Sequence, residues 1–406
     1  MSLSNLDLLA VIGWAVAMVW IVIVGVFLRA SRKQAGLKPL SGDVNSEALP
    51  RLSVIVAARN ELGCIENCIR TLFKQDYPGL EVVAVNDRST DGTGEILDRL
   101  AIEFAGRLRV RHVEALPPGW FGKPHALTLG LESATGSLIC FTDADCEFLA
   151  PSALRTAVAE QTRRNLDFFS IAAKYTMTSL RECLAVPCCS EVLLSWLRPE
   201  RIEDPRWPDA FANGAFILVR REPFERIGGW GAVRAKVSED LALARLAKQL
   251  GLRAGIAQAE GFYQTSSYGN LRDSWNGWSR IFMGALSPAQ LALTLARMLM
   301  LFVTPLCAVL WGVLTGNVEW LTQGAGLGFL VAFGLRSTMD LGMFRLVGAP
   351  VAAAVLAPVG RLFAMAAATR ALLSHAGLVH THWRGASFSA GQLVIPALSK
   401  PGHQIP

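Results

Sequence analysis

Leu138-Ile139-Cys140-Phe141-Thr142 is a short apolar run, and Asp143-Ala144-Asp145 follows it directly. A run of this length predicts a buried β-strand. Similar runs at residues 52–58 and 80–85 are each followed by a polar loop and a helical pattern. The alternation of strand, loop and helix over residues 52–164 predicts an α/β fold with an open, parallel, Rossmann-like sheet. In such a sheet, ligands bind at the carboxyl ends of the strands.

The Asp143-Ala144-Asp145 motif places two carboxylates just beyond a predicted strand end. Carboxylate oxygens suit hard divalent cations such as Mg²⁺ or Mn²⁺, and such a cation neutralises a diphosphate leaving group. An isolated Asp-x-Asp pair is more often a solvated turn. The neighbouring motifs therefore have to decide between the two interpretations.

Two further polar clusters fall at predicted strand ends. Arg59-Asn60-Glu61 follows the strand at 52–58, and the segment NDRSTDGT (86–93) follows the strand at 80–85. Ser, Thr, Asp and Gly also begin helices for purely local reasons, so the second cluster fits a helix N-cap as well as a binding loop. Both interpretations can hold together.

Five motifs in a fixed order carry a resemblance to a known family. They are VIVAARNE (54–61), VNDRSTDGT (85–93), GWFGKPHAL (119–127), TDAD (142–145) and SED (238–240). In this order they resemble the family 2 inverting glycosyltransferases, which have the GT-A nucleotide-sugar fold. The most similar branch is that of membrane-bound lipid glycosyltransferases of the ceramide glucosyltransferase, carotenoid-glycosylating and hopanoid-associated kind. That branch also carries a Trp-Lys/Arg-Gly-Arg block, which is here Trp383-Arg384-Gly385 followed by Ala386.

The resemblance implies roles for residues in the donor half of a site. Asp145 is expected to bind the Mg²⁺ or Mn²⁺, and Asp143 to face the sugar or to support the metal ligand. Lys123, at a predicted helix start, is expected to contact the donor phosphates or sugar. The residues expected to hold the base and ribose are Ala57, Arg59, Glu61, Asp87 and Ser89. Because a carboxylate such as Asp87 can accept the uracil imide N–H, a UDP-sugar is the expected donor.

The acceptor half of the expected site needs a base, because inverting transfer removes the proton of the acceptor hydroxyl. Asp240 is the expected base, with Glu239 beside it, before a predicted helix at 241–250. Acidic residues at a helix start also occur simply as partners of the helix dipole. Asn213 and Gly214, on a predicted strand, are expected to form the acceptor-side floor, since Gly permits close approach.

The region that closes the site departs from the pattern of the processive family members. Those proteins carry Gln-x-x-Arg-Trp, whereas this chain has Trp275, Trp278 and Arg280 in the corresponding region. Residues 271–288 are predicted to form an amphipathic interfacial helix with its Trp side chains at headgroup level. The departure predicts non-processive transfer to a membrane lipid. A processive polysaccharide synthase or a polyprenyl-phosphate sugar transferase is the alternative, and a non-catalytic nucleotide-binding membrane scaffold is the more remote one.

The composition is that of a membrane protein, with 52% hydrophobic residues, 18% charged residues and a mean hydropathy of +0.35. Residues 8–28 are apolar and long enough to span a bilayer, and Arg29, Arg32 and Lys33 follow them. The positive-inside rule then predicts a cytoplasmic catalytic domain. With further apolar segments in the C-terminal third, the chain is expected to be a multi-pass protein of the cell (inner) membrane.

The chain is expected to divide into six parts. They are an N-terminal transmembrane anchor (1–30), a linker (31–50), a GT-A catalytic domain (51–270), the interfacial helix (271–288), C-terminal membrane helices (289–373) and a tail (374–406). The apolar segment at 347–369 contains Pro350, Pro358 and Arg361, so it either crosses the membrane or forms a re-entrant hairpin. The sequence supports both.

Charge and cysteine content argue against other classes of function. The net charge of +6 is modest, and no aromatic and basic RNA-binding motif accompanies it, so no nucleic acid partner is expected. The eight cysteines form no C-x-x-C pair, which argues against a zinc site and favours reduced packing residues. The expected partners are a nucleotide-sugar donor, a lipid acceptor and the membrane bilayer.

Overall fold

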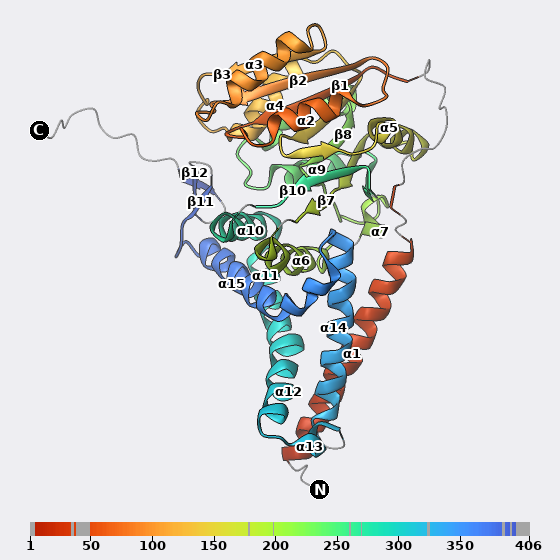
Figure 1. Ribbon diagram of the computed structural model, residues 1–406, viewed down its shortest axis with the longest axis vertical. Coiled ribbons are helices and arrows are strands. Elements are labelled where there is room, and N and C mark those ends of the chain that lie inside the picture. The colour runs from red at the N-terminus through yellow and green to blue at the C-terminus, as the bar shows by residue number, and fades with distance from the viewer. Residues whose placement is uncertain are drawn as a thin grey trace, which may run out of the picture.

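The structure, a computed structural model, describes residues 5–33, 36–37, 49–177, 179–197, 199–259, 261–268, 270–322, 325–383, 386–389 and 392–394. An α/β domain lies at one end, a stem of long helices at the other, and a layer of helices lies across the molecule between them (Figure 1). Most of the predicted linker lies outside the described residues, as do Arg384 and Gly385 of the C-terminal block.

The α/β domain is built on a seven-stranded sheet of order β3-β2-β1-β4-β8-β6-β9. These strands are β3 (Leu108–Val113), β2 (Leu80–Asp87), β1 (Leu52–Ala58), β4 (Leu138–Asp143), β8 (Phe216–Arg220), β6 (Phe168–Ala172) and β9 (Ala254–Gln258). The first four strands along the chain run parallel, as predicted. Val54 and Val56 enter the core on one face of β1, and Ile55 enters the core on the other face. Burial on both faces accounts for the continuous apolar runs in the sequence.

The parallel arrangement does not continue into the second half of the sheet, because β8 runs antiparallel to both β4 and β6. The chain passes through α6 (Leu180–Leu194) and α7 (Pro199–Ile202), and it then enters β8 where β4 ends, so that Phe216 pairs with Thr142. The prediction that Asn213 and Gly214 lie on a strand is therefore wrong. Both residues precede β8 and lie at the carboxyl edge of β4.

Helices cover both faces of this mixed sheet. They are α2 (Ile65–Phe73), α3 (Thr93–Glu103), α4 (Gly122–Ser133), α5 (Ala153–Arg163), α8 (Arg221–Arg226), η2 (Gly229–Val233) and α9 (Glu239–Gln249). The layer of helices that crosses the molecule consists mainly of α6, α10 (Leu271–Ala285) and α15 (Ala357–His375), called the transverse helices below. A small sheet of β5 (Cys146–Phe148), β10 (Tyr263–Ser266) and β7 (Lys174–Thr176) lies between the large sheet and these helices (Figure 1). The carboxyl edge of β1, β2 and β4 thus faces the transverse helices.

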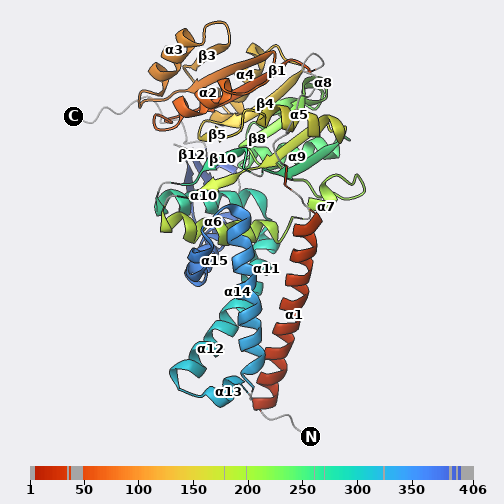
Figure 2. The ribbon, with the colours of Figure 1, turned by 45° about the vertical axis from the view of Figure 1, so that its right-hand side comes forward.

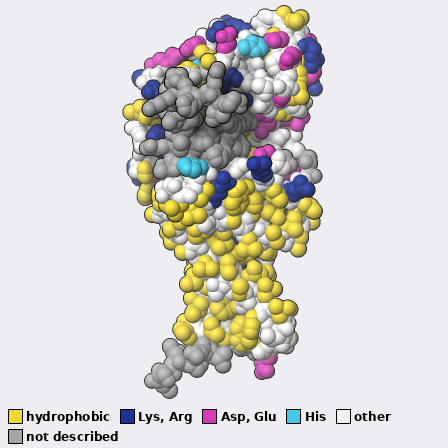
Figure 3. Space-filling view, turned by 90° about the vertical axis from the view of Figure 1, so that its left-hand side faces the viewer, with side chains coloured by type: hydrophobic (Ala, Val, Ile, Leu, Met, Phe, Trp, Pro, Cys, Tyr) yellow, Lys and Arg dark blue, Asp and Glu magenta, His cyan; other side chains and the backbone are white. Residues whose placement is uncertain are grey.

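Within the described residues, four helical stretches are long and apolar enough to cross a membrane: Asp7–Arg29, Pro288–Leu314, Leu327–Val347 and Val351–His375. They belong to α1 (Asn5–Lys33), to α11 (Pro288–Met298), η3 (Leu299–Val303) and α12 (Thr304–Leu314), to α14 (Leu327–Val347), and to η4 (Val351–Leu356) with α15 (Ala357–His375). The short α13 (Val318–Thr322) joins α12 to α14 at the far end of the stem. Hydrophobic side chains cover the stem, and Lys and Arg gather where it meets the upper part (Figure 3).

α1 and α14 lie side by side along the stem, as Figure 2 also shows. A Cβ added at Gly328 would come 2.5 Å from the backbone of Gly13, so glycine at this crossing lets the two helices touch.

The fourth apolar stretch does not run down the stem. α15 lies across it and packs against α6 and α10 (Leu271–Ala285). At its start, Gly348 lies close to the carbonyl of Tyr175 in the α/β domain, and at its end β11 (Thr381–Trp383) packs against α10. Both ends of the segment are therefore on the side of the α/β domain, which favours the re-entrant interpretation. Two further short strands, β12 (Ala386–Ser389) and β13 (Gln392–Val394), continue the sheet that β11 begins.

The prediction that the Trp residues of the interfacial helix face lipid headgroups is wrong for Trp278. This side chain on α10 is only 2% exposed and packs against Phe282 inside the protein. α10 is covered by α6 on one side and α15 on another, and its apolar face is therefore satisfied by protein contacts.

Candidate active site

The strand ends bring the predicted motifs together. Ala57 of β1 pairs with Asp143 of β4, and Ala58 pairs with Asn86 of β2, so the three polar clusters lie side by side. They line one continuous cavity of about 2400 Å³ between the sheet edge and the transverse helices. Small-molecule pockets usually measure roughly 300–1,000 Å³, so this cavity has room for two substrates.

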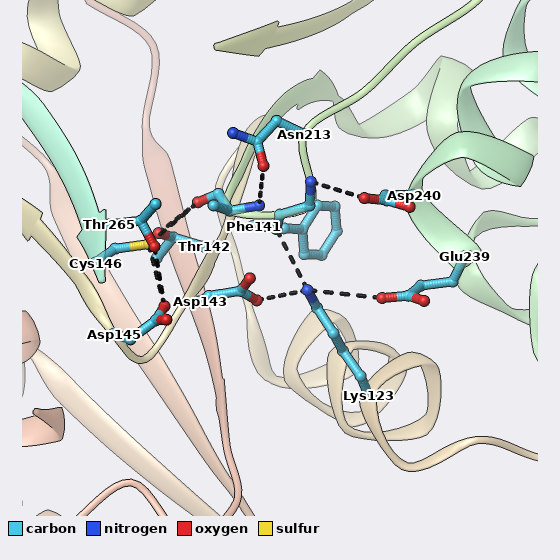
Figure 4. A network of polar contacts seen from close by, with 12 residues as sticks. Lys123, Phe141, Thr142, Asp143, Asp145, Cys146, Asn213, Glu239, Asp240 and Thr265 are labelled. Carbon is cyan, nitrogen blue, oxygen red and sulfur yellow. Dashed lines mark hydrogen bonds and ion pairs between the residues drawn. The ribbon is translucent and has the colours of Figure 1, made fainter. Parts of the chain in front are cut away.

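Lys123, in the first turn of α4, joins two carboxylates from distant parts of the chain (Figure 4). Its Nζ lies 2.5 Å from Asp143 Oδ1 and 3.6 Å from Glu239 Oε1. It also donates to the carbonyl of Gly214 at 3.5 Å. Although burial alone would lower the pKa of Lys123, Asp143 and Glu239 raise it above its ordinary range. The lysine is therefore a fixed positive charge at the centre of the site.

Asp240 lies in the first turn of α9 and is held by two backbone donors. The N–H of Gly214 donates to its Oδ2 at 3.0 Å, and the N–H of Leu241 donates to its Oδ1 at 2.7 Å. Desolvation, followed by repulsion from Glu239, raises the pKa of Asp240 to about 6. A carboxylate with this pKa is ionised at neutral pH and is a better proton acceptor than an ordinary aspartate.

Gly214 has a steric reason to be glycine. A Cβ added there would come 3.0 Å from Asp240 Oδ2 and 3.1 Å from Lys123 Nζ. The residue therefore lets the backbone pass between the two charged groups.

Asp145 lies in the turn between β4 and β5 and lines the same cavity. The Thr265 hydroxyl donates to its Oδ1 at 3.3 Å, and the Cys146 thiol lies 3.8 Å from the same oxygen. Within the described residues, no three His, Cys, Asp or Glu side chains form a closed metal cage. An oxygen-only ligand beside a large cavity still fits Mg²⁺ or Mn²⁺, because Mg²⁺ commonly takes one or two carboxylates and completes its shell with phosphate and water.

The residues predicted to bind the donor lie at the ends of β1 and β2. Asp87 is buried, and the guanidinium of Arg88 donates to both of its oxygens, at 2.8 and 3.2 Å. A Cβ at Gly122 would come 2.2 Å from Asp87 Oδ2, so only glycine lets α4 begin this close to the carboxylate. Arg59 and Glu61 line the cavity as well.

Ser89 has a different position from the one its predicted role implies. Its hydroxyl accepts the N–H of Asn60, and the side chain of Asn60 accepts the N–H of Thr90. Asn60 and Arg88 both have left-handed backbones, with φ of 56° and 57°. Strained residues of this kind concentrate at binding loops. Ser89 thus links the two loops by hydrogen bonds and does not line the cavity.

Of the residues predicted to lie on the acceptor side, Asn213, Gly214, Glu239, Trp278 and Arg280 line the cavity. Arg280 Nη1 donates to the carbonyl of Val237 at 2.9 Å, which fixes α10 against the segment that carries Asp240. Trp275 instead packs edge-to-face on Phe363 of α15 and lies outside the described lining of the cavity.

Two family models match the chain. The model described as glycosyl transferase family 2 matches residues 53–228, and the one described as glycosyl transferase family group 2 matches residues 208–368. Together the two models cover residues 53–368. Over this stretch the chain belongs to the family 2 glycosyltransferases. Its mixed Rossmann-like sheet fits the GT-A fold of that family.

Two curated proteins illustrate the similarity of this glycosyltransferase to its relatives. It is 25% identical to the 4,4'-diaponeurosporenoate glycosyltransferase of Staphylococcus aureus over 59% of the chain, and 27% identical to the beta-monoglucosyldiacylglycerol synthase of Synechocystis over 50%. These matches span 64% and 41% of the two relatives. Among solved structures, a mannosyltransferase from Pyrobaculum calidifontis in complex with GDP-Man and Mn²⁺ is 22% identical, with a TM-score of 0.49 over 87% of this chain and 99% of that one.

Two residues of the glycosyltransferase site were missed from the sequence. Arg88 holds Asp87, and its position next to a buried carboxylate was a signal that could have been used. Thr265 contacts Asp145 from β10, 120 residues further along the chain. The sequence around Thr265 carries no motif that predicts this contact, because the contact arises only when β10 pairs with β5 in the folded protein.

Proposed function

We propose that this glycosyltransferase transfers one sugar from a UDP-sugar to a hydroxyl group of a membrane lipid, with inversion and with the aid of Mg²⁺ or Mn²⁺. The observation that carries the proposal is the bridge through Lys123. It pairs with Asp143 at the end of β4 and with Glu239 next to Asp240. A diphosphate site and a proton acceptor are thus adjacent in one cavity.

In the donor half, Asp87 would accept a hydrogen bond from the base, and Arg59, Glu61 and Ala57 would border the base and ribose. Asp145 would be the protein ligand of the divalent cation, which supplies charge neutralisation for the departing diphosphate. Lys123 would contact the donor phosphates or sugar, and Asp143 would orient Lys123 or the sugar.

In the acceptor half, Asp240 would take the proton of the lipid hydroxyl as the hydroxyl oxygen forms a bond to the anomeric carbon. The bond from that carbon to the diphosphate oxygen breaks on the opposite face, which gives inversion. The pKa of about 6 for Asp240 supports its role as the base, because the carboxylate is charged at neutral pH and still basic. Glu239, Asn213 and Gly214 would border the acceptor.

The lipid acceptor is supported by the membrane module and by the relatives, whose names refer to a carotenoid-type acid and to a diacylglycerol glycoside. Four apolar helical stretches support a multi-pass protein, and Arg29 at the end of the first supports a cytoplasmic α/β domain. The enzyme would then act at the inner face of the cell membrane, where nucleotide sugars are available.

The test is to incubate membranes that contain the protein with labelled UDP-sugars and to identify labelled lipids by mass spectrometry. One sugar added to one lipid, dependent on Mg²⁺ or Mn²⁺ and absent in Asp240→Asn, is the expected result. A ladder of longer products would support a processive synthase, and labelled polyprenyl phosphate would support the other alternative. Absence of any labelled product with every UDP-sugar would overturn the proposal.

A further inference from the structure

The cavity does not end at the carboxylates. It continues to the upper ends of α1 and α14, where Phe27 and Leu346 line it, and along α6, where Leu193 and Leu194 line it. α14 packs against both α1 and α6 and forms the back of this extension. Apolar side chains thus join the wall of the cavity here.

The two helices at this extension are also the ones that enter the apolar stem. Val22 of α1 is 62% exposed, so the outer surface just below the extension is suited to hydrocarbon. Arg29 and Arg345, at the ends of α1 and α14, line the cavity at the same level. Arginine at the end of a membrane helix marks the headgroup region, because its charge reaches toward water and phosphate.

From this arrangement we infer that the apolar extension between α1, α6 and α14 is the binding slot for the hydrocarbon chain of the acceptor lipid. The inference rests on the proposed function for the identity of the occupant as acceptor. The chain rises from the bilayer past Arg29 and Arg345, and its hydroxyl end points toward Asp240. The volume of about 2400 Å³ allows this, since a nucleotide sugar alone would leave much of the cavity empty.

The slot explains why the α/β domain lies directly on the transverse helices. A lipid hydroxyl does not leave the headgroup region without exposing its hydrocarbon chain to water, at a cost that grows with each CH₂ group exposed. A slot that covers the upper part of the chain with leucine side chains removes this cost. Leu193 and Leu346 are therefore expected to determine which chains are accepted.

The test uses a long-chain alcohol with a diazirine on the part of its chain next to the hydroxyl group, incorporated with the full-length protein into phosphatidylcholine vesicles. Photolysis is expected to label peptides that contain Leu193 and Leu346. Leu193→Trp, which fills the slot, should reduce this labelling and raise the KM for the lipid acceptor at least tenfold without changing the KM for the donor. Leu310→Trp, on the exposed face of α12, is the matched control and should change neither quantity.

A second variant, Leu346→Phe, should give the same pattern if Leu193→Trp does not fold. Unchanged labelling and unchanged acceptor KM in a folded slot variant that still transfers sugar would overturn the slot and leave the proposed function intact. Labelling that both variants block, in a protein that transfers no sugar to any lipid, would support the slot and count against the proposed function.

Discussion

Two clusters of charged side chains, one in the cavity and one in the membrane module, differ in their charge balance. In the cavity, Lys123 forms ion pairs with Asp143 and Glu239, and Asp145 and Asp240 line the same space. These five residues carry an excess of negative charge. A cation or a proton would reduce this excess.

The cluster in the membrane module is balanced. Arg336 of α14 is paired with Glu191 of α6 and, at 2.7 Å, with Asp340, and Arg361 of α15 is also paired with Asp340. Both arginines are 3% exposed, and their guanidinium groups lie over the rings of Trp20 and Phe302. Two positive and two negative groups balance in charge here, although, among the described residues, Arg336 Nε and two nitrogens of Arg361 are buried without a hydrogen-bond partner. A charge-balanced network thus ties three helices together, whereas we propose that the unbalanced cluster in the cavity, called the incomplete cluster below, receives a substrate.

The strongest test of the incomplete cluster is Asp145→Ala. If Asp145 is the protein ligand of the divalent cation, the variant should lose transfer and metal-dependent UDP binding while staying folded. Glu147→Ala is the matched control, since Glu147 lies two residues away and pairs with Gln264 outside the large cavity. Binding of UDP is measured by calorimetry with and without Mn²⁺. Full activity in the presence of a chelator would remove Asp145 from this role.

Asp240→Asn should have the next largest effect. The change preserves the size of the side chain but removes its basicity, and general base catalysis contributes ~10²–10⁴-fold in rate. Turnover should fall by about this factor while the affinity for the UDP-sugar changes little. Labelled-lipid formation and donor calorimetry measure the two quantities. Near-normal turnover would make Glu239 the next candidate for the base.

A substitution in the balanced cluster should lower the stability of the fold but leave the rate of sugar transfer nearly unchanged. Asp340→Leu leaves Arg336 and Arg361 with too little negative charge, and the loss of one partner from a buried ion pair costs about 3–5 kcal/mol. Thermal unfolding in detergent should therefore shift to lower temperature, with turnover per folded molecule little changed. A large loss of turnover in a fully folded variant would show that this cluster takes part in the reaction.

Local signals made much of the site predictable from the sequence. Runs such as 52–58 and 138–142 are apolar because both faces of the strand are buried, and the motifs follow them because the carboxyl ends of parallel strands share one edge. Lys123, Asp143 and Asp240 lie close together although they are separated by up to 117 residues, since each follows a strand or begins a helix at that edge.

What the sequence did not predict depends on packing between distant elements. Because β8 is antiparallel to β4 and begins only at Phe216, Asn213 lies before the strand and not on it. Trp278 is buried among protein side chains and does not lie at the membrane surface. The buried cluster around Arg336 was missed because Glu191, Asp340 and Arg361 come from three helices with no common motif. Hydropathy alone also did not distinguish α15, which lies across the stem, from helices that run along it.

The smallest predicted effect is the pH dependence of the incomplete cluster. With a pKa of about 6 for Asp240, kcat/KM should be nearly level above pH 7 and should fall about tenfold between pH 7 and pH 5, as the base is protonated.

The free energy of unfolding should change with pH in the opposite direction to kcat/KM, because the folded-state pKa of Asp240 is raised above the ordinary value of 3.8. A raised pKa stabilises the fold fully below about pH 4, and this contribution is lost as the pH rises through about 6. Since repulsion from Glu239 helps to raise the pKa, Glu239→Gln should move the inflection of kcat/KM to lower pH, and Asp240→Asn should remove this part of the pH dependence of unfolding. An inflection that stays in place in Glu239→Gln would mean that a different group titrates, and the base would then have to be sought outside the first turn of α9.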